Sequence, residues 1–206
     1  MGRDAAAFWD RMARRYAAMN LADPAAYEAT LARVRAYLSP GDRVLEIGCG
    51  TGGTAVRLAP AVTSYTATDI APKMIAFARE RPEPRGMPHL AFRIGAAGDT
   101  AGAPFDAVLA FNLLHLLPDL PRRLAAIRAA LRPGGLLLSK TPCLGELSPL
   151  LRLILPPLGL IGLAPRVVWL TREALETQIA AAGFAILETG DYPARRAQRF
   201  VVARRP

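Results

Sequence analysis

The feature that most constrains this chain is a short apolar strand that runs directly into a glycine-rich loop and then into a helix. The strand is predicted over 44–47 and the loop over 48–53. Glycines let the backbone turn tightly and let a ligand lie directly against it. Three of these glycines fit the dinucleotide-binding spacing G-x-G-x-x-G, and Asp69 follows about 20 residues later as a partner for ribose hydroxyls. The sequence therefore predicts a ligand that carries a ribose.

Strands and helices alternate through the rest of the chain. Repeated strand–helix units with short connections predict an α/β fold, with a doubly wound, mostly parallel sheet and helices on both faces. Ligands of such sheets bind beyond the carboxyl ends of the strands, beside the first one. A site is therefore expected in residues 46–53, 69–74, 95–99 and 111–115. The further strands are predicted over 62–68, 89–94, 105–111, 136–140, 184–188 and 200–203, and helices over 72–79, over 121–131 and from Thr171 onward.

The 206 residues are predicted to form one domain with four parts. Residues 1–40 form an N-terminal helical lid, residues 42–141 a cofactor-binding core, residues 143–170 an apolar substrate cap, and residues 171–206 a C-terminal helix and β-hairpin. The hydrophobic content of 52% rules out a disordered chain. Early charges interrupt any secretory leader, and the longest uncharged stretch of the C-terminal half is too short to span a bilayer. We therefore expect a cytoplasmic protein, with peripheral membrane contact left open.

Glu46, at the end of the first strand, separates two hypotheses for the ribose-bearing ligand. A pyrophosphate favours backbone N–H groups, the N-terminus of a helix and no nearby anion. A carboxylate two residues before the first glycine opposes a pyrophosphate, but it suits a ligand with an ammonium and a sulfonium group. S-adenosylmethionine has both groups and no phosphate. The residue therefore favours S-adenosylmethionine over NAD.

Residues 42–140 resemble the core of class I S-adenosylmethionine-dependent methyltransferases, in particular the small-molecule branch that includes the ubiquinone/menaquinone C-methyltransferase type. The first family motif is similar to VLEIGCGTG at 44–52, and the second to TDIAPKM at 68–74. Later motifs resemble FDAV, LHLL, LRPGG, AGF and FVVAR, which begin at residues 105, 114, 131, 182 and 200. The resemblance implies a seven-stranded sheet in the order 3-2-1-4-5-7-6, with the last strand antiparallel.

The resemblance also implies roles for the matching residues. Gly48 and Gly50 would lie against the methionine part of the cofactor, with Glu46 orienting the loop or the amino group. Asp69 would bind the ribose hydroxyls. The other implied cofactor contacts come from the same loop and from the ends of later strands: Cys49, Thr51, Gly52, Ala96, Ala97, Asn112 and Leu113, with Ile70 and Met74 at the adenine.

Two segments depart from patterns known in such enzymes. The family often has Gly-Asp-Ala after the third strand, where the Asp accepts a hydrogen bond from the adenine amino group, but this chain has Gly-Ala-Ala at 95–97. Either Asp99 or a backbone group takes that place. Enzymes that methylate the amino groups of nucleic-acid bases commonly show Asn-Pro-Pro-aromatic where this chain has Asn-Leu-Leu at 112–114. We therefore expect no specific nucleic-acid partner.

Acceptor choice is assigned to the segments outside the core. His115 is either a general base toward the acceptor or a packing residue. Trp9 and Tyr16 either cover the acceptor or pack on the domain. Segment 143–170 is too apolar for a surface connection, so it either covers an apolar acceptor, packs at a dimer interface or touches a membrane. These features favour a hydrophobic or amphiphilic small-molecule acceptor, quinone-like or lipid-like.

The resulting prediction is an enzyme that transfers a methyl group from S-adenosylmethionine by in-line displacement and releases S-adenosylhomocysteine. Two alternatives remain: a non-catalytic S-adenosylmethionine-binding module, and an NAD(P)-dependent oxidoreductase, which the lack of a Tyr-x-x-x-Lys pair disfavours. No metal site is expected, because two cysteines and two histidines stand too far apart in the sequence. The net charge of +9 reflects either biased composition or an anionic partner, and the scattered arginines favour the former. The sequence leaves the oligomeric state open.

Overall fold

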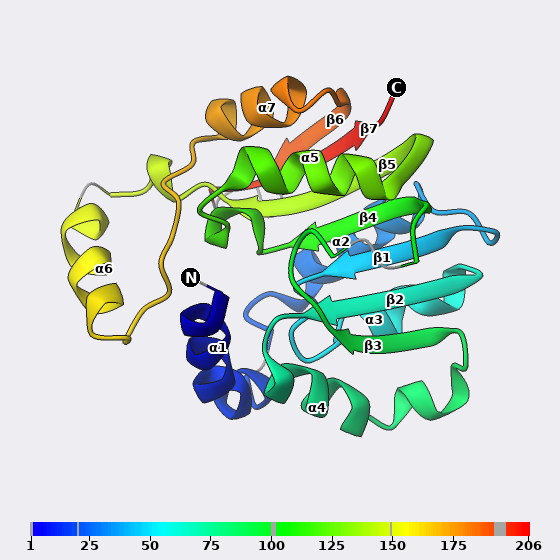
Figure 1. The fold of residues 1–206 in the computed structure, drawn as a ribbon, viewed down its shortest axis with the longest axis horizontal. Coiled ribbons are helices and arrows are strands. Elements are labelled where there is room, and N and C mark those ends of the chain that lie inside the picture. Colours follow the sequence, from blue (N-terminus) through cyan, green and yellow to red (C-terminus); the bar gives the residue numbers. More distant parts are fainter. Residues whose placement is uncertain (1, 20, 100–101, 149, 192–196) are drawn as a thin grey trace.

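A seven-stranded sheet forms the centre of the protein (Figure 1). The computed structural model describes residues 2–19, 21–99, 102–148, 150–191 and 197–206, and in these residues the strand order is β3-β2-β1-β4-β5-β7-β6. β7 runs antiparallel to β5 and β6, whereas the other neighbouring strands are parallel. The predicted fold class is therefore confirmed. The strands are β1 (Arg43–Ile47), β2 (Ser64–Asp69), β3 (Leu90–Ile94), β4 (Phe105–Phe111), β5 (Leu131–Pro142), β6 (Ala185–Asp191) and β7 (Gln198–Arg204).

Helices cover both faces of the sheet. The buried side chains of α2, α3 and α4 pack on one face, and those of α5 and α7 on the other. Side chains begin two of these helices: Asp23 accepts a hydrogen bond from the backbone N–H of Ala26, and Thr171 accepts one from that of Ala174. The helices are α1 (Gly2–Ala17), α2 (Pro24–Arg35), α3 (Ala55–Leu58), α4 (Pro72–Glu80), α5 (Leu120–Ala130), α6 (Leu150–Leu160) and α7 (Arg172–Ala181).

β5 differs most from its predicted extent. It begins at Leu131, directly after α5, and not after the Pro-Gly-Gly segment that was expected to stop the helix and precede the strand. Leu131 pairs with Phe105, and the register then shifts before the regular pairing of β4 and β5 resumes. The N–H of Gly134 donates to the carbonyl oxygen of Arg205 at 2.8 Å. The irregular segment therefore stays within the sheet because the C-terminal strand supplies it with a partner.

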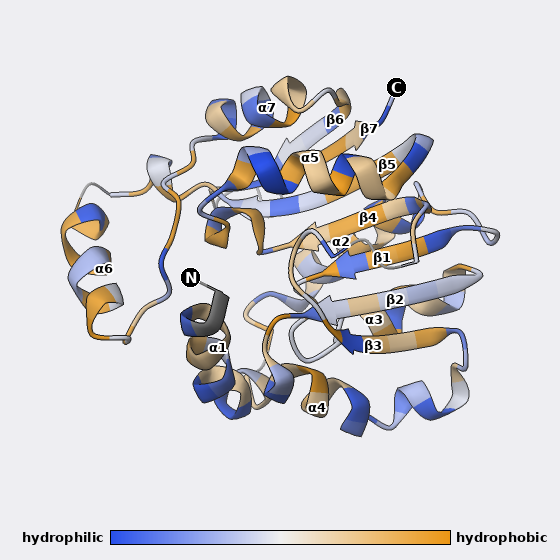
Figure 2. Cartoon of the chain, in the orientation of Figure 1, coloured by the Kyte–Doolittle hydropathy of each residue, from blue (hydrophilic) through white to orange (hydrophobic). Residues whose placement is uncertain are grey.

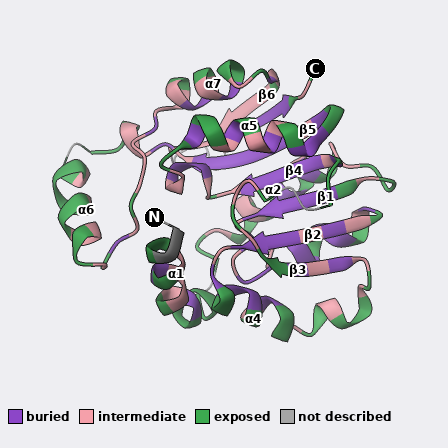
Figure 3. Cartoon of the chain, in the orientation of Figure 1, coloured by how far each residue is buried: buried purple, intermediate pink, exposed green. Residues whose placement is uncertain are grey.

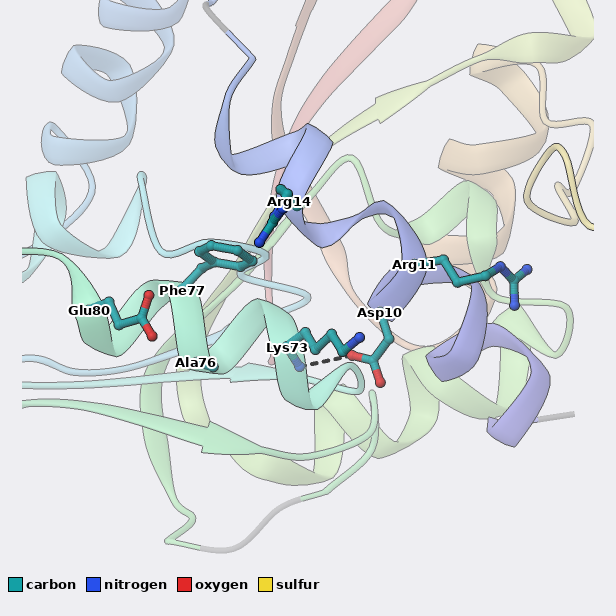
Figure 4. A pocket seen from close by; sticks show the side chains of 7 residues that line it. All are labelled: Asp10, Arg11, Arg14, Lys73, Ala76, Phe77 and Glu80. Carbon is teal, nitrogen blue, oxygen red and sulfur yellow. Dashed lines mark hydrogen bonds between the residues drawn. The ribbon is translucent and has the colours of Figure 1, made fainter.

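α1 is held across the carboxyl edge of the sheet by α4. Ala13 packs with Ala71 and Met74 in a small buried cluster. Asp10 accepts a hydrogen bond at 2.8 Å from the backbone N–H of Lys73, in the first turn of α4 (Figure 4). An acidic side chain at this point satisfies an N–H group that has no partner inside the helix. These contacts place α1 over the end of β2, where it can form one wall of a site.

α6 stands apart from the body of the protein (Figure 1). None of its residues is buried, although the segment is rich in leucine and isoleucine (Figure 3). In the part of the chain that the structure describes, no helix is both long and apolar enough to span a membrane. The apolar segment predicted over 143–170 is therefore largely on the surface.

Candidate active site

A cavity of about 310 Å³ lies at the carboxyl ends of β1, β2 and β4, where the strand pattern predicted a site. Its walls come from the glycine loop, the start of α4, the segment after β4, and α1. The structure therefore brings segments that are far apart in the sequence to one place. The predicted residues that line this cavity are Trp9, Tyr16, Gly48, Gly50, Asp69, Ile70, Met74, Ala97, Asn112, Leu113 and His115.

Gly95 and Phe111 also line the cavity, and both lie in the ranges 95–99 and 111–115 where the site was expected. Several other lining residues were not predicted. Pro142 stands at the end of β5, and the rule that ligands lie beyond strand ends could have identified it. Pro165 brings the apolar segment to the cavity, and the role of that segment as a cap stays a prediction. The remaining ones are Ala5, Leu116 and Leu117.

The glycine loop depends on two positions where a side chain would not fit. Gly48 and Gly52 have φ angles of 69° and 77°, in the left-handed region that favours glycine. A Cβ atom on Gly48 would lie 2.8 Å from the side chain of Leu113, and one on Gly52 would lie 2.8 Å from the ring of Phe92. The absence of a side chain at Gly48 lets Leu113, after β4, contact the loop. The absence of one at Gly52 lets the ring of Phe92, on β3, pack against the loop.

Asp69 connects the glycine loop to the start of α4. One carboxylate oxygen accepts a hydrogen bond from the N–H of Gly50 and the other accepts one from that of Ala71, each at 2.9 Å. Burial raises the pKa of Asp69 above its usual value, and the backbone hydrogen bonds oppose that rise. Each carboxylate oxygen can accept a second hydrogen bond. Because Asp69 also lines the cavity, it can still accept from two ribose hydroxyls.

Glu46 is buried near the end of β1. It is 2% exposed and does not line the cavity. Its carboxylate accepts a hydrogen bond at 2.9 Å from the hydroxyl of Tyr65 on β2, and burial raises its pKa to about 7. In β1 the side chains alternate between the faces of the sheet, and that of Glu46 lies among residues covered by α2 and α3. Of the two expected roles of Glu46, orienting the loop or the amino group, these contacts favour the first, because the side chain lies beneath the loop and outside the cavity lining.

Four other predicted residues lie beside the cavity without lining it. Cys49 is buried, and burial raises the pKa of its thiol, so the sulfur is not a nucleophile. The carbonyl oxygen of Thr51 accepts a hydrogen bond from Arg81 at 2.6 Å. Gly52 packs against the ring of Phe92 on β3, and Ala96 is exposed. These four residues therefore belong to the glycine loop and to the turn after β3 but do not contact the cavity.

The turn after β3 carries the departure from the family pattern. Gly95 and Ala97 line the cavity, whereas Ala96 points elsewhere. A Cβ atom on Gly95 would lie 3.3 Å from a carboxylate oxygen of Asp99, so this acid lies directly beside the turn. Asp99 therefore stays a predicted partner for the adenine amino group.

His115 lines the cavity from the turn after β4. Its side chain is buried, and Nδ1 has no hydrogen-bond partner among the described residues. Burial lowers the pKa of the imidazole to about 4, so the ring is neutral near pH 7. Its backbone oxygen accepts a hydrogen bond at 2.7 Å from Val168, which joins the turn to the chain returning from α6. A neutral ring can accept a proton, and because Nδ1 is buried, a ligand would have to reach the ring at Nε2.

α1 supplies the aromatic wall. Trp9 and Tyr16 pack edge to face, with ring centroids 6.4 Å apart, and both line the cavity. Tyr16 lies over the glycine loop, where a Cβ atom on Gly50 would be 3.5 Å from its ring. The two aromatic residues therefore face the ligand site as well as the domain.

Taken together, these side chains fit the cofactor that the sequence favoured. The glycine loop brings bare backbone to the cavity at Gly48 and Gly50. Asp69 offers acceptors for a ribose, while Ile70 and Met74 give an apolar surface for a base. Asp69 would hold the ribose, and the loop the amino-acid part.

The family comparison agrees with this geometry. Residues 45–137 match the family described as a methyltransferase domain. The matched residues, a little less than half of the chain, include the glycine loop, Asp69 and His115. The match and the sheet order confirm the resemblance drawn from the sequence, and with it S-adenosylmethionine as the cofactor in place of a nicotinamide dinucleotide.

Relatives of this methyltransferase domain occur in proteins of very different size. The highly reducing polyketide synthase lcsB of Purpureocillium lilacinum is 34% identical over 128 residues, which are 56% of this chain and 5% of that protein. The magnesium-protoporphyrin O-methyltransferase of Rhodobacter capsulatus is 37% identical over 89 residues, 42% of this chain and 40% of that one. A phthiotriol/phenolphthiotriol dimycocerosates methyltransferase of Mycobacterium leprae is 38% identical over 102 residues, 46% and 36% of the two chains. The chain thus spans less than half the length of these relatives.

Solved structures share the fold of the methyltransferase domain. A complex of DhpI with SAH has a TM-score of 0.76 at 22% identity, and the match covers 99% of this chain and 96% of that one. The [4+2]-cyclase SpnF has a TM-score of 0.68 at 21% identity, with 88% and 80% of the two chains covered. At such identities the likeness extends to the fold only.

Replacing Asp69 with Asn tests the assigned ribose partner, and Glu46→Gln is its matched control. Asn keeps the size of the side chain but removes its charge and one acceptor oxygen, so S-adenosylhomocysteine should bind about 10- to 100-fold more weakly in calorimetry. Glu46→Gln should leave the affinity within about twofold, because residue 46 does not line the cavity. Equal losses in the two variants would contradict the placement of Glu46 beneath the loop.

Proposed function

We propose that the protein is an S-adenosylmethionine-dependent methyltransferase whose acceptor is a hydrophobic or amphiphilic small molecule. The observation that carries the proposal is the make-up of the cavity lining. The glycine loop and Asp69 supply groups suited to the cofactor. Much of the remaining lining consists of a neutral His115 and of apolar side chains: Trp9, Phe111, Leu116, Leu117, Pro142 and Pro165.

The relatives support this acceptor class. One relative is named as a methyltransferase of magnesium-protoporphyrin, another as a methyltransferase of phthiotriol and phenolphthiotriol dimycocerosates, and a third as a polyketide synthase. Such compounds present large apolar bodies with few polar groups. An apolar wall with one neutral imidazole suits such an acceptor better than it suits a highly charged one.

Catalysis in this site would rest mainly on positioning and on the exclusion of water. When bound, the cofactor supplies an electrophilic methyl group on a sulfonium, and transfer is fastest when donor and acceptor are held in line. The apolar walls exclude water and hold the acceptor. His115 lines the cavity, where its neutral ring is placed to accept the proton that the acceptor loses as the new bond to carbon forms. The proton then passes to solvent.

A second candidate is a cofactor-binding protein that performs no methyl transfer. The structural likeness to SpnF, which is described as a [4+2]-cyclase, favours keeping this candidate, because the fold serves more than one chemistry. The distinction depends on the product and not on cofactor binding, which both candidates share.

Radiolabelled methyl transfer decides between the two candidates. The protein is incubated with methyl-labelled S-adenosylmethionine and a cell extract, which is then separated into lipid and aqueous fractions. The proposal predicts label in the organic fraction that depends on active protein and is abolished by Asp69→Asn. Binding of the cofactor with no transfer into either fraction would support the second candidate, and label confined to the aqueous fraction would contradict an apolar acceptor.

Replacing His115 with Ala tests its role as the base. Turnover should fall about 10²-fold or more while the affinity for S-adenosylhomocysteine is retained, because the ring is assigned to the acceptor. Since its pKa is about 4, the neutral form prevails above that value. Wild-type turnover should therefore stay flat between about pH 6 and pH 8, whereas an ordinary histidine with a pKa of about 6.5 would give a fall toward acid in this range.

His89→Ala is the control for the His115 variant. The ring of His89 lies 3.0 Å from the carbonyl oxygen of Ala59, just before β3 and hence at the amino ends of the parallel strands. Its replacement should leave turnover unchanged. Unchanged turnover in His115→Ala as well would show that His115 only packs.

A further inference from the structure

α6 exposes its apolar side chains. Leu150, Leu153, Ile154 and Ile161 recur at spacings of three, four and seven residues, which places them on one side of a helix. Leu153 is 74% exposed, and Leu160 at the end of the helix is 80% exposed. Figure 2 shows α6 as mostly hydrophobic, although it stands away from the body of the protein. An exposed apolar surface of this kind marks a site of contact with a partner or a membrane.

The charges within residues 147–171 are of one sign, and Glu146 just before them is ion-paired with Arg172. Residues 147–171 contain no Asp or Glu, and their two charged residues are Arg152 and Arg166, both exposed. Arg152 is two positions from both Leu150 and Ile154, so it lies on the side of α6 away from the apolar stripe, over the ring of Trp169. An apolar face with cations on the opposite side and at its ends is the pattern of a helix that lies in a membrane interface.

α1 adds further positive charge beside α6. A guanidinium nitrogen of Arg11 lies 3.5 Å from the carbonyl oxygen of Gly162, just after α6. Arg14 and Arg15 on the same helix are also exposed. Arg11 and Arg14 also line the groove between α1 and α4, together with Asp10 (Figure 4). Arg11 therefore places one further positive charge beside the end of α6.

We propose that α6 and its flanks dock on an anionic membrane surface, with leucine and isoleucine side chains in the acyl boundary and the arginines at the phosphates. Charge complementarity favours this occupant over a second copy of the chain. In a two-fold dimer the same patch meets itself, so the positive charges around it would be brought together with no acidic residue from 147–171 to compensate them. A surface of anionic lipids satisfies both the apolar stripe and the cations.

Docking at α6 would bring the cavity close to the lipid. The chain that leaves α6 lines the cavity at Pro165, and Val168 then bonds to the backbone of His115. This part of the inference rests on the proposed function, because an acceptor with a large apolar body partitions into the bilayer. It would enter the site between α6 and α1.

Vesicle sedimentation of the full chain tests the proposal. The wild type should pellet with vesicles of phosphatidylcholine and phosphatidylglycerol, less with phosphatidylcholine alone, and less at high salt. The double variant Leu153→Gln/Leu160→Gln should bind the anionic vesicles about tenfold more weakly or worse. Ile94→Gln/Leu187→Gln replaces two exposed aliphatic side chains on β3 and β6 and should bind within about twofold of the wild type.

Three results would overturn membrane docking. They are failure of the wild type to pellet at low salt, equal binding by the α6 variant, and a solution dimer that the α6 variant converts to monomer, which would assign the surface to a second copy. Calorimetry with S-adenosylhomocysteine separates this proposal from the proposed function. Retained binding of that ligand with no vesicle binding rejects the docking alone, whereas absent ligand binding rejects the proposed function whatever the vesicles show.

Discussion

The carboxylate of Asp69 is the contact on which the site depends. It ends β2, and its two oxygens hold the N–H groups of Gly50 in the loop and Ala71 before α4. The loop is also tied to β2 by a 2.9 Å hydrogen bond from Cys49 to the carbonyl oxygen of Thr68. Asp69 therefore joins the connection after β1 to the connection after β2, and it also lines the cavity. Because the same group orders the loop and can accept from a ligand, the cofactor-binding part of the site is formed before a ligand arrives.

The rest of the cavity is built on that frame by side chains with no charge at neutral pH. His115 is neutral because burial depresses its pKa. Glu46 lies beneath the loop and outside the cavity lining, and it carries only part of its charge because burial raises its pKa to about 7. Tyr65 stabilises the charged form of Glu46 through its hydroxyl. An acceptor site with little fixed charge and aromatic cover from α1 suits a poorly solvated acceptor. It also strengthens any electrostatic interaction that forms in the site.

Much of this arrangement could be predicted from the sequence. β4 begins and ends at the predicted residues because an apolar run bounded by Pro104 and Asn112 has clear limits. The position of the cavity could be predicted because ligands of a doubly wound parallel sheet bind beyond the carboxyl ends of the strands, whichever side chains are present. Which of its two expected roles Glu46 takes could not be predicted, since it depends on which side chain of β2 lies beside it once the strands pair. The start of β5 was missed because the partner of Gly134 comes from the C-terminal strand, and the exposure of α6 could not be read from an apolar composition.

Amide hydrogen exchange with and without S-adenosylhomocysteine tests the central claim most directly, because it maps where the ligand lies without any substitution. The account predicts slower exchange, on adding the ligand, in three segments that meet only at the carboxyl edge of the sheet: 48–53, 69–74 and 111–115. Exchange in β6, at the far edge, should not change. Slowing confined to other parts of the chain, or none in these three segments with the ligand bound, would contradict the account.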